Sequence, residues 1–474
     1  MSDAPSDAKA ILDELLAAAG RPASGDQVEL RGADPVLPTP FRAGELGTAA
    51  IAAVGLEAAR LMEAATGKAQ TVSVDVDAGA AAMRSWTYLK DVTPGVVTPP
   101  RGPDIRQFFH TKDDRWIFLH RRAAHHAARQ EQVLGCGHAE DEVVAAVEGW
   151  NAEELEEAIV ANGACAAMAR THDEWTATEQ AAAVAGMPLL RITRIGDSDP
   201  VPLPAADRPL SGLRVIDLTH VLAGPTCART LAEHGADVLR IGRDGSGDGN
   251  PMQRDTGHGK RSTVLDLKKA EDADVLRGLL READVFSQGF RPGAVTGLGF
   301  SPEEVAALRP GAVCVSLSAF GSEGPWRDRR GYDSVVQSAS GICVEVAGPD
   351  GEPRFLPVSA LDYVTGYLAA FAVLVALQRR ATEGGSYHVE LSLAQTGHYF
   401  DRLGRVPAEA WKERAPELPA ERLDDLLTER ETPFGRLRHL RPVTRMSLTP
   451  AEWELPTVPM AHDAPEWRDA PRRH

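Results

Sequence analysis

Short apolar runs alternate with amphipathic segments between residues 211 and 397. The runs LRVIDL at 213–218 and ADVLRI at 236–241 are typical of buried parallel strands. Helical periodicity follows in segments such as DADVLRGLLREA at 272–283. The expected strands are 213–218, 236–241, 262–267, 284–290 and 312–320. This alternation predicts an α/β fold, a doubly wound Rossmann-like parallel sheet with helices on both faces.

The region before residue 197 has a different pattern. The segment QFFHTKDDRWIFLH at 107–120 predicts two strands about a polar turn, and helical segments follow at 139–150 and 152–163. These elements predict a smaller α+β domain. A stretch rich in proline and acidic residues then interrupts all periodicity and is expected to be a linker.

The chain of 474 residues exceeds what one hydrophobic core usually supports, so several parts are expected. The tail is rich in Arg, Glu and Pro and is expected to wrap the body, partly without order. The expected parts are an N-terminal helix with a partial repeat at 1–95, the small domain at 96–196, the linker at 197–210, the large domain at 211–400 and the tail at 401–474.

The most apolar segment, at about 362–377, begins with an acid. It is shorter than the roughly 20 residues that a bilayer requires, so we expect a buried helix. A carboxylate at a helix start commonly accepts hydrogen bonds from free backbone N–H groups. Capping is therefore one interpretation of Asp362. If Ser359 caps the helix instead, Asp362 falls in the first turn and its carboxylate is available to a cleft.

This helix has a counterpart near the N-terminus. Residues 47–76 match residues 364–393, which lie 317 positions later, in their order of apolar helix, turn and alternating strand. At that offset Asp362 corresponds to Glu45. Chance similarity between Ala-rich helices is the alternative, but the shared turn and strand favour a partial internal duplication.

Composition narrows the possible partners. The 51 Lys and Arg residues against 68 Asp and Glu residues give a net charge of −17, which argues against nucleic-acid or anionic-membrane binding. An anionic ligand therefore needs a local basic cluster. The five cysteines are scattered without paired spacing, so neither disulfides nor a zinc site are expected. The N-terminus is unlike a signal peptide, and we expect a cytoplasmic protein.

Ordered motifs in the second half of the chain resemble the family III CoA-transferases, the group of formyl-CoA transferase, the carnitine CoA-transferases and the α-methylacyl-CoA racemases. The resemblance covers residues 209–397, and residues 41–195 look like the family's later half with its small domain. The motifs are LSGLRVIDLTHVLAGPTCARTLAEHGADVLRI, GHGKRSTVLDLK, GFRPGAVTGLGF, RGYDSVVQSASG, ALDYVTGYLAAF and HVELSLAQ.

The order of the segments differs from that of the family, because its members ordinarily place the small domain after the nucleotide-binding half. We infer a partial tandem duplication or a permutation. One chain is then expected to build both the CoA-binding half and the small domain that covers its site. Ordinary members use an interlaced homodimer for this purpose, and a homodimer stays possible here.

The resemblance implies that Asp362 is the catalytic nucleophile, 29 positions after Asp333 of the GYD motif. A carboxylate can attack an acyl-CoA thioester to form a mixed anhydride, and the released thiolate can then form an aspartyl-CoA thioester. Backbone N–H groups at a helix start would stabilise the oxyanions. The partners implied are an acyl-CoA and a small carboxylic acid, with coenzyme A as cofactor and no metal. Glu45 is interpreted as a relic, a second site or a cap, and we favour the relic.

The resemblance also implies the residues that hold CoA. The loop THVLAGP at 219–225 matches the family's loop beside the pantetheine, and cations are needed for the phosphates. An exposed, solvated charge is the alternative for each cation. The glycines at 245–249 do not form a dinucleotide fingerprint. The candidates are His220, Ala223, Gly224, Arg243, Lys260, Arg261, Arg291 and Asp333.

Two other functions stay open. The first is an acyl-CoA racemase, but that branch has a histidine where this chain has Tyr332, and a tyrosine of pKa near 10 is a poor base for an α-proton. The second is a non-catalytic CoA-binding protein. Leu222 replaces a glutamine of the formyl-CoA enzyme, so oxalate or formate specificity is not expected. The small-domain histidines, His120, His125 and His126, are expected on the surface.

Overall fold

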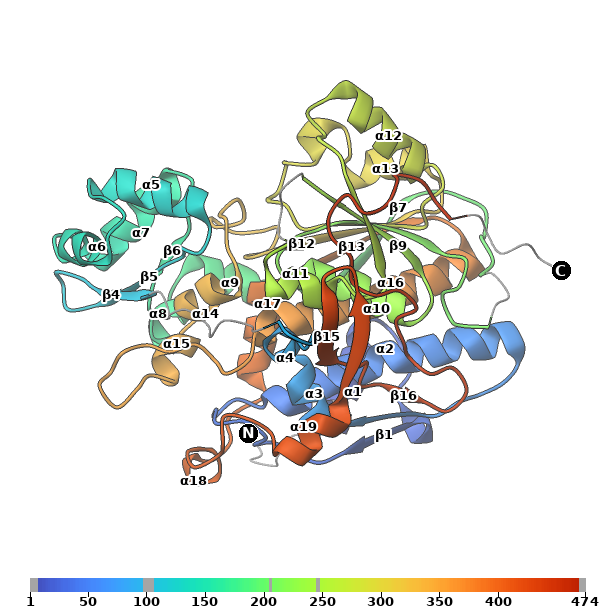
Figure 1. Cartoon of the computed structure of the whole chain (residues 1–474), viewed down its shortest axis with the longest axis horizontal. Coiled ribbons are helices and arrows are strands. Elements are labelled where there is room, and N and C mark those ends of the chain that lie inside the picture. Colours follow the sequence, from blue (N-terminus) through green and yellow to red (C-terminus); the bar gives the residue numbers. More distant parts are fainter. Residues whose placement is uncertain (1–6, 97–105, 204–206, 244–247, 469–474) are drawn as a thin grey trace.

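A seven-stranded sheet lies at the centre of the computed structural model, which describes residues 7–96, 106–203, 207–243 and 248–468 (Figure 1). Its order is β10-β9-β8-β11-β12-β13-β7, and all neighbours are parallel except β13 and β7. The predicted parallel α/β sheet is confirmed. The strands are β7 (Arg191–Gly196), β8 (Arg214–Leu218), β9 (Asp237–Gly242), β10 (Lys260–Val264), β11 (Val285–Gln288), β12 (Val313–Ser318) and β13 (Ser386–Ser392).

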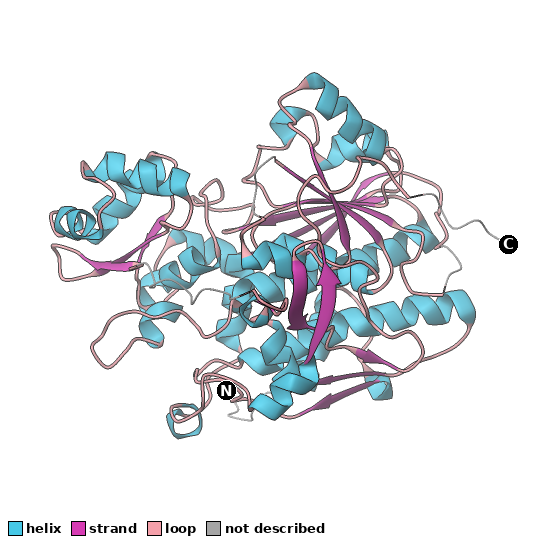
Figure 2. Ribbon diagram, viewed as in Figure 1, coloured by secondary structure: helices cyan, strands magenta, loops and turns pink. Residues whose placement is uncertain are grey.

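Helices cover both faces of this sheet (Figure 2). Successive strand residues point to opposite faces, so Ile216 packs with α12 and α13 while Val215 packs with α10 and α16. The prediction of a doubly wound sheet is therefore confirmed. The helices are α10 (Ala223–Glu233), α11 (Pro251–Thr256), α12 (Ala270–Leu280), α13 (Pro302–Leu308), α14 (Asp333–Ala339), α15 (Ile342–Glu345), α16 (Ala360–Glu383) and α17 (Leu393–Arg402).

Several element ends differ from the expected ones. Helix α10 begins at Ala223, two residues before Pro225. Strand β10 ends at Val264, so the last residues of the expected strand 262–267 leave the sheet. Four residues of the loop after β9, 244–247, lie outside the described part. The ends of the sheet strands are nevertheless where loops can gather around a ligand.

The small domain is built around a three-stranded antiparallel sheet with its own apolar core. The two strands expected about a polar turn are confirmed as β4 (Phe108–His110) and β5 (Trp116–Leu119). The other elements are β6 (Ala166–Met168), α5 (Ala124–Leu134), α6 (Glu140–Val147), α7 (Ala152–Ala161), α8 (His172–Thr176) and α9 (Glu179–Gly186). After α9 the chain enters β7 of the central sheet, so the expected linker joins two strands of one sheet.

The expected repeat corresponds to two helices of equal length. Helices α2 (Ala43–Thr66) and α16 each have 24 residues, begin 317 positions apart and pack in one core (Figure 1). Each is followed by a strand and a further helix, which in the first copy are β2 (Val72–Asp75) and α3 (Val76–Ala82). The remaining N-terminal elements are α1 (Ala8–Ala18), β1 (Val28–Arg31), α4 (Ser85–Tyr88) and β3 (Lys90–Asp91), with a short 3-10 helix at Gly25–Gln27. A second 3-10 helix, Thr296–Leu298, lies between β11 and α13 of the large domain.

Helix α16 is longer than the apolar segment expected at 362–377. Among the described residues it is the one helix that is long and apolar enough to cross a membrane, and its apolar part is entirely buried in the protein. It therefore serves as the central core helix.

The C-terminal segment lies across both halves of the chain. Strand β15 pairs with β3 and strand β16 with β2, both in the N-terminal region. Trp453 reaches α10, where its indole N–H donates to the carbonyl of Arg229. The β14–β15 hairpin was not expected. The elements are α18 (Ala408–Trp411), α19 (Ala420–Leu426), β14 (Leu427–Thr432), β15 (Gly435–Leu440) and β16 (Arg445–Met446).

Candidate active site

Asp362 lies in the first turn of α16, on the wall of a cavity of about 830 Å³. Asp362 is only 7% exposed. Ser359 precedes the helix but makes no capping hydrogen bond through its side chain. The cap is supplied by Asp333, whose carboxylate accepts from the backbone N–H of Asp362 at 3.0 Å. The carboxylate of Asp362 is thus not needed as the cap of its own helix.

The N-terminus of α10 faces this carboxylate. The backbone N–H of Ala223, the first residue of α10, hydrogen-bonds to Asp362. The two helices approach closely because residue 366 is glycine, since a Cβ there would lie 2.5 Å from the carbonyl oxygen of Ala223. Gly224 allows a similar approach to Thr219, whose Cβ would lie 2.4 Å from an added Cβ. A helix start at this position favours negative charge on Asp362 or on a reaction intermediate.

The loop before α10 contains a strained residue. Val221 has a φ of 71°, in the left-handed region that β-branched residues rarely adopt. Val221 lines the cavity of Asp362, while the preceding His220 lines a second cavity of about 270 Å³. Strain of this kind is concentrated at functional sites. The loop therefore forms a wall between two adjacent cavities, and Tyr332 lines both.

The second cavity lies where the order of the strands reverses. Strand β9 follows β8 on one side of the sheet and β12 follows β11 on the other, and the loops after β8 and β11 supply His220 and Arg291. Such a switch point is the usual ligand position in a doubly wound sheet. Arg330 also lines this cavity, and Arg243 is close enough to His125 on the cavity wall to help lower its pKa. Positive charge is thus concentrated there despite the acidic chain.

Lys260 and Arg261 are engaged elsewhere in the protein. Lys260 is 1% exposed, and its ammonium donates to Asp217 at 2.7 Å and to the carbonyl of Pro225 at 2.8 Å. Arg261 binds both oxygens of Asp237 at 3.0 and 2.9 Å. Neither is among the residues that line the two cavities. Their surroundings favour a structural role over the phosphate contact expected for them.

Asp333 and Asp362 form a buried pair of carboxyl groups. Burial raises the pKa of Asp362 well above its usual range, the nearby Asp333 raises it further, and the N–H of Ala223 opposes this. Burial raises the pKa of Asp333 to about 6, against hydrogen bonds from the N–H of Asp362 and from the Gln337 side chain. Asp333 therefore orients the start of α16 and disfavours ionisation of Asp362.

We expect the acid limb of the pH–rate profile to depend on this pair. A nucleophilic Asp362 must be ionised, so activity rises with pH through its raised pKa. Asp333→Asn removes the neighbouring negative charge and should move this limb to lower pH, measured as initial rate against pH. Asp34→Asn is the matched control, since Asp34 accepts from the N–H of Glu45 at 2.8 Å in the other copy. If the acid limb of Asp333→Asn stayed at the pH of the parent protein, Asp333 would not be raising the pKa of Asp362.

Two histidines of the small domain belong to the site, contrary to the expectation that they lie on the surface. His120 stacks on Tyr332 with ring centroids 4.2 Å apart, and Nε2 of the buried His126 lies 3.3 Å from the Tyr332 hydroxyl. His125 is exposed, as expected. Burial lowers the pKa of His120 to about 4 and that of His126 to about 3, and raises that of Tyr332 to about 12. Tyr332 is thus a weaker acid than a free tyrosine, and its hydroxyl stays protonated at neutral pH.

The corresponding position of the first copy has a different environment. Glu45 is the third residue of α2, as Asp362 is of α16, and Asp34 caps α2 as Asp333 caps α16. The carboxylate of Glu45 is paired with Arg42 at 3.0 Å, however, and Glu45 does not line either cavity described above. The two helices therefore begin in the same way, but the Asp362 carboxylate of α16 lines a cavity while the Glu45 carboxylate of α2 is paired with an arginine.

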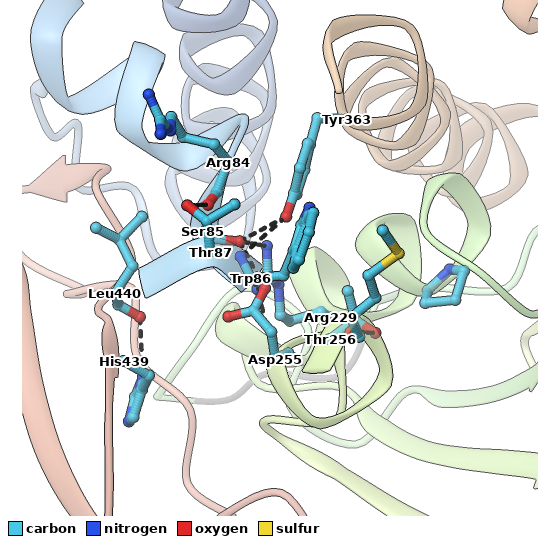
Figure 3. A network of polar contacts seen from close by, with 12 residues as sticks. Arg84, Ser85, Trp86, Thr87, Arg229, Asp255, Thr256, Tyr363, His439 and Leu440 are labelled. Carbon is cyan, nitrogen blue, oxygen red and sulfur yellow. Dashed lines mark hydrogen bonds and ion pairs between the residues drawn. The ribbon is translucent and has the colours of Figure 1, made fainter. Parts of the chain in front are cut away.

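A buried polar network lies beneath the site, next to Asp362 in the sequence (Figure 3). The Tyr363 hydroxyl and the Ser85 hydroxyl are 2.8 Å apart, and Ser85 donates to Asp255 at 2.5 Å. Asp255 is paired with Arg229 of α10 at 2.7 Å. The network joins α4, α10, α11 and α16, so it connects the N-terminal region to the start of the helix that carries Asp362.

No group of three or more His, Cys, Asp or Glu side chains suited to a metal ion occurs in the described part of the chain. The arrangement offers instead a buried carboxylate, a helix N-terminus and a basic neighbouring cavity.

Comparison with known proteins identifies relatives. A model described as CoA-transferase family III matches residues 5–201 and 210–447. The succinate–glutarate CoA-transferase of Agrobacterium fabrum is 34% identical over 209 residues, which cover 40% of this chain and 52% of that protein. The acetyl-CoA:oxalate CoA-transferase of Acetobacter aceti is 36% identical over 197 residues, which cover 39% of this chain and 51% of that protein.

A crystal structure of a CAIB/BAIF family protein from Brucella suis is 31% identical to this chain, with a TM-score of 0.38, and the match covers 40% of this chain and 55% of that one. The chain thus spans about half the length of the curated relatives that it matches. The gap between the two segments matched by the family model lies inside the expected linker at 197–210.

Proposed function

The chain belongs to CoA-transferase family III, and from this premise we propose that it moves CoA from an acyl-CoA to a carboxylic acid with Asp362 as nucleophile. The observation that carries the proposal is the position of the Asp362 carboxylate. It lies buried on a cavity wall against the N–H of Ala223, while Asp333 supplies the cap of α16. Capping alone does not account for a costly buried acid in that place.

The proposed reaction has four steps. The Asp362 carboxylate attacks the thioester carbonyl, forming a mixed anhydride and releasing the CoA thiolate. The thiolate attacks the aspartyl carbonyl, which releases the donor acid and leaves an aspartyl-CoA thioester. The acceptor carboxylate attacks this thioester to form a second anhydride and free the thiolate again. The thiolate then attacks the acceptor's carbonyl, which yields the new acyl-CoA and restores Asp362.

Each step passes through a tetrahedral intermediate with a negatively charged oxygen. The N–H of Ala223 at the start of α10 is a fixed positive dipole directed at Asp362. Preorganised donors of this kind commonly supply a large share of the rate enhancement. Gly366 contributes by allowing the two helices to approach.

We assign the phosphates of CoA to the second cavity. His220 and Arg291 line it, and Arg243 lies near its wall. The pantetheine would then pass Val221 of the loop before α10, and Ala223 and Gly224 at the start of that helix, toward Asp362. Lys260 is not needed as a phosphate ligand, because its bonds to Asp217 and Pro225 instead hold the first turn of α10 to the sheet.

The proposal is tested by trapping the activated carboxylate. The protein is incubated with each of a panel of acyl-CoAs in the presence of hydroxylamine, which converts an activated aspartyl group into a hydroxamate. Intact-protein and peptide mass spectrometry should locate the change at Asp362. Bound CoA without labelling by any donor would contradict the proposed function and favour a non-catalytic CoA-binding protein or a racemase.

We also expect a monomer to be active. The segment that contains Phe118 and His120 and the helix that contains Asp362 line one cavity and belong to the same chain. Size-exclusion chromatography with light scattering separates monomer from dimer, and the monomeric fraction should become labelled by acyl-CoA and hydroxylamine. Labelling confined to a dimeric fraction would show that a second copy is required.

A further inference from the structure

The cavity beside Asp362 is much larger than a short acid requires. Its volume of about 830 Å³ is near the upper end of the range of roughly 300–1,000 Å³ found for sites that enclose drug-sized molecules. The cysteamine end of CoA must also enter it, but the phosphates are assigned to the separate cavity at the end of the sheet. Considerable room is therefore left for the acyl group.

Apolar side chains supply most of the exposed area of this cavity's wall, although four arginines, Arg84, Arg106, Arg121 and Arg122, also line it. The first three of these arginines are paired with Glu417, Glu140 and Glu131, respectively. The apolar side chains come from several parts of the chain. The main contributors are Trp86, Phe118, Val221, Met252, Phe355 and Val358. Water in contact with such a wall is unfavourable, so a ligand that displaces it gains binding energy in proportion to its apolar area.

The wall is fixed by aromatic contacts between the small domain and the segment before α16. The rings of Phe118 and Phe355 meet edge to face with centroids 5.1 Å apart, and Phe108 lies 5.0 Å from Phe355. His120 stacks on Tyr332 at 4.2 Å on another side of the same cavity. Each such pair contributes stability beyond that of the area that it buries, so separating the rings is costly. The cavity is therefore not expected to contract around a small ligand.

We propose that the acyl group handled at Asp362 is bulky and mostly apolar, such as a medium-length alkyl chain or an aromatic ring. This inference rests on the proposed CoA transfer and specifies its substrate class. An acetyl or oxalyl group would leave most of the apolar wall in contact with water. In a hydrophobic pocket a single methylene changes kcat/KM about 10- to 200-fold, so a group that fills the cavity is strongly preferred.

The first test compares donors in the half-reaction, which needs no known acceptor. The rate of hydroxylamine-dependent labelling of Asp362 is measured with acetyl-CoA, octanoyl-CoA and phenylacetyl-CoA. We expect a rate constant at least about tenfold higher for one of the larger donors than for acetyl-CoA. Fastest labelling by acetyl-CoA would overturn the substrate class alone. Absence of labelling with every donor would overturn the proposed function and this inference with it.

The second test narrows the cavity. Met252→Trp places a larger side chain on the wall and should lower the ratio of octanoyl-CoA to acetyl-CoA labelling rates at least about tenfold. Leu448→Trp is the matched control, because Leu448 is 54% exposed and does not line the cavity. Circular dichroism checks the fold of both variants. An unchanged ratio in folded Met252→Trp would contradict the assignment of the acyl group to this cavity.

Discussion

Asp362→Asn should lower the rate of CoA transfer by at least about 10³-fold, because loss of an essential nucleophile can cost about 10⁶-fold. Asparagine has nearly the same shape as aspartate, so the contact with α10 and the packing of α16 should survive. It lacks the negatively charged oxygen that attacks the thioester. The measurement is the initial rate of CoA exchange between an acyl-CoA and a free acid, together with CoA affinity by calorimetry.

Glu45→Gln is the matched control for this substitution. Glu45 has the same position in α2 as Asp362 in α16, and both are buried, but Glu45 is paired with Arg42. We expect transfer by Glu45→Gln to stay within about twofold of the parent rate. Equal losses in the two variants would mean that the effect is structural. Full activity in Asp362→Asn with intact CoA binding would exclude Asp362 as the nucleophile.

The central sheet and the first turn of α16 were predictable because local patterns encode them. Apolar runs identified the strands, and the ordered motifs singled out Asp362 among many acids. The repeat was predictable for a similar reason, since equal spacing of apolar residues produced equal helices at 43–66 and 360–383. What the sequence did not reveal was that Asp333 caps α16, because this bond spans 29 residues and two elements.

The contribution of the small domain could not be found from periodicity. The buried face of α5 carries His126, Ala127 and Gln130, two of which are polar, so no apolar stripe marks it. His126 lies where the small domain meets Tyr332 of the large one. Histidines of this kind become recognisable once the tertiary contact is known.

The role of Lys260 likewise depends on a tertiary contact that the sequence does not show. A lysine in a strand near a predicted ligand loop is compatible with a phosphate contact or with an internal ion pair. Its partner Asp217 lies 43 residues earlier, on β8, with β9 between the two strands. Sequence spacing gives no measure of such a distance, and the burial of both groups decides between the two roles.

Asp255→Ala should lower the free energy of unfolding by about 3–5 kcal/mol, because it leaves the buried Arg229 without its partner. The side chains of Arg229 and Asp255 are only 4% and 0% exposed, and their atoms are 2.7 Å apart. Asp255 also accepts from Ser85, which contacts Tyr363, so the N-terminal region and the start of α16 should loosen together (Figure 3). The measurement is the urea midpoint of unfolding.

Asp274→Ala provides the matched control, since the pair of Arg277 and Asp274 has side chains 38% and 75% exposed and should contribute about 0–1 kcal/mol. The double variant Arg229→Met with Asp255→Leu should recover most of the lost stability, because it removes both buried charges. Equal midpoints for Asp255→Ala and Asp274→Ala would contradict a central role for the network. If the double variant regained stability but not the rate of CoA transfer, these polar contacts would also position Asp362.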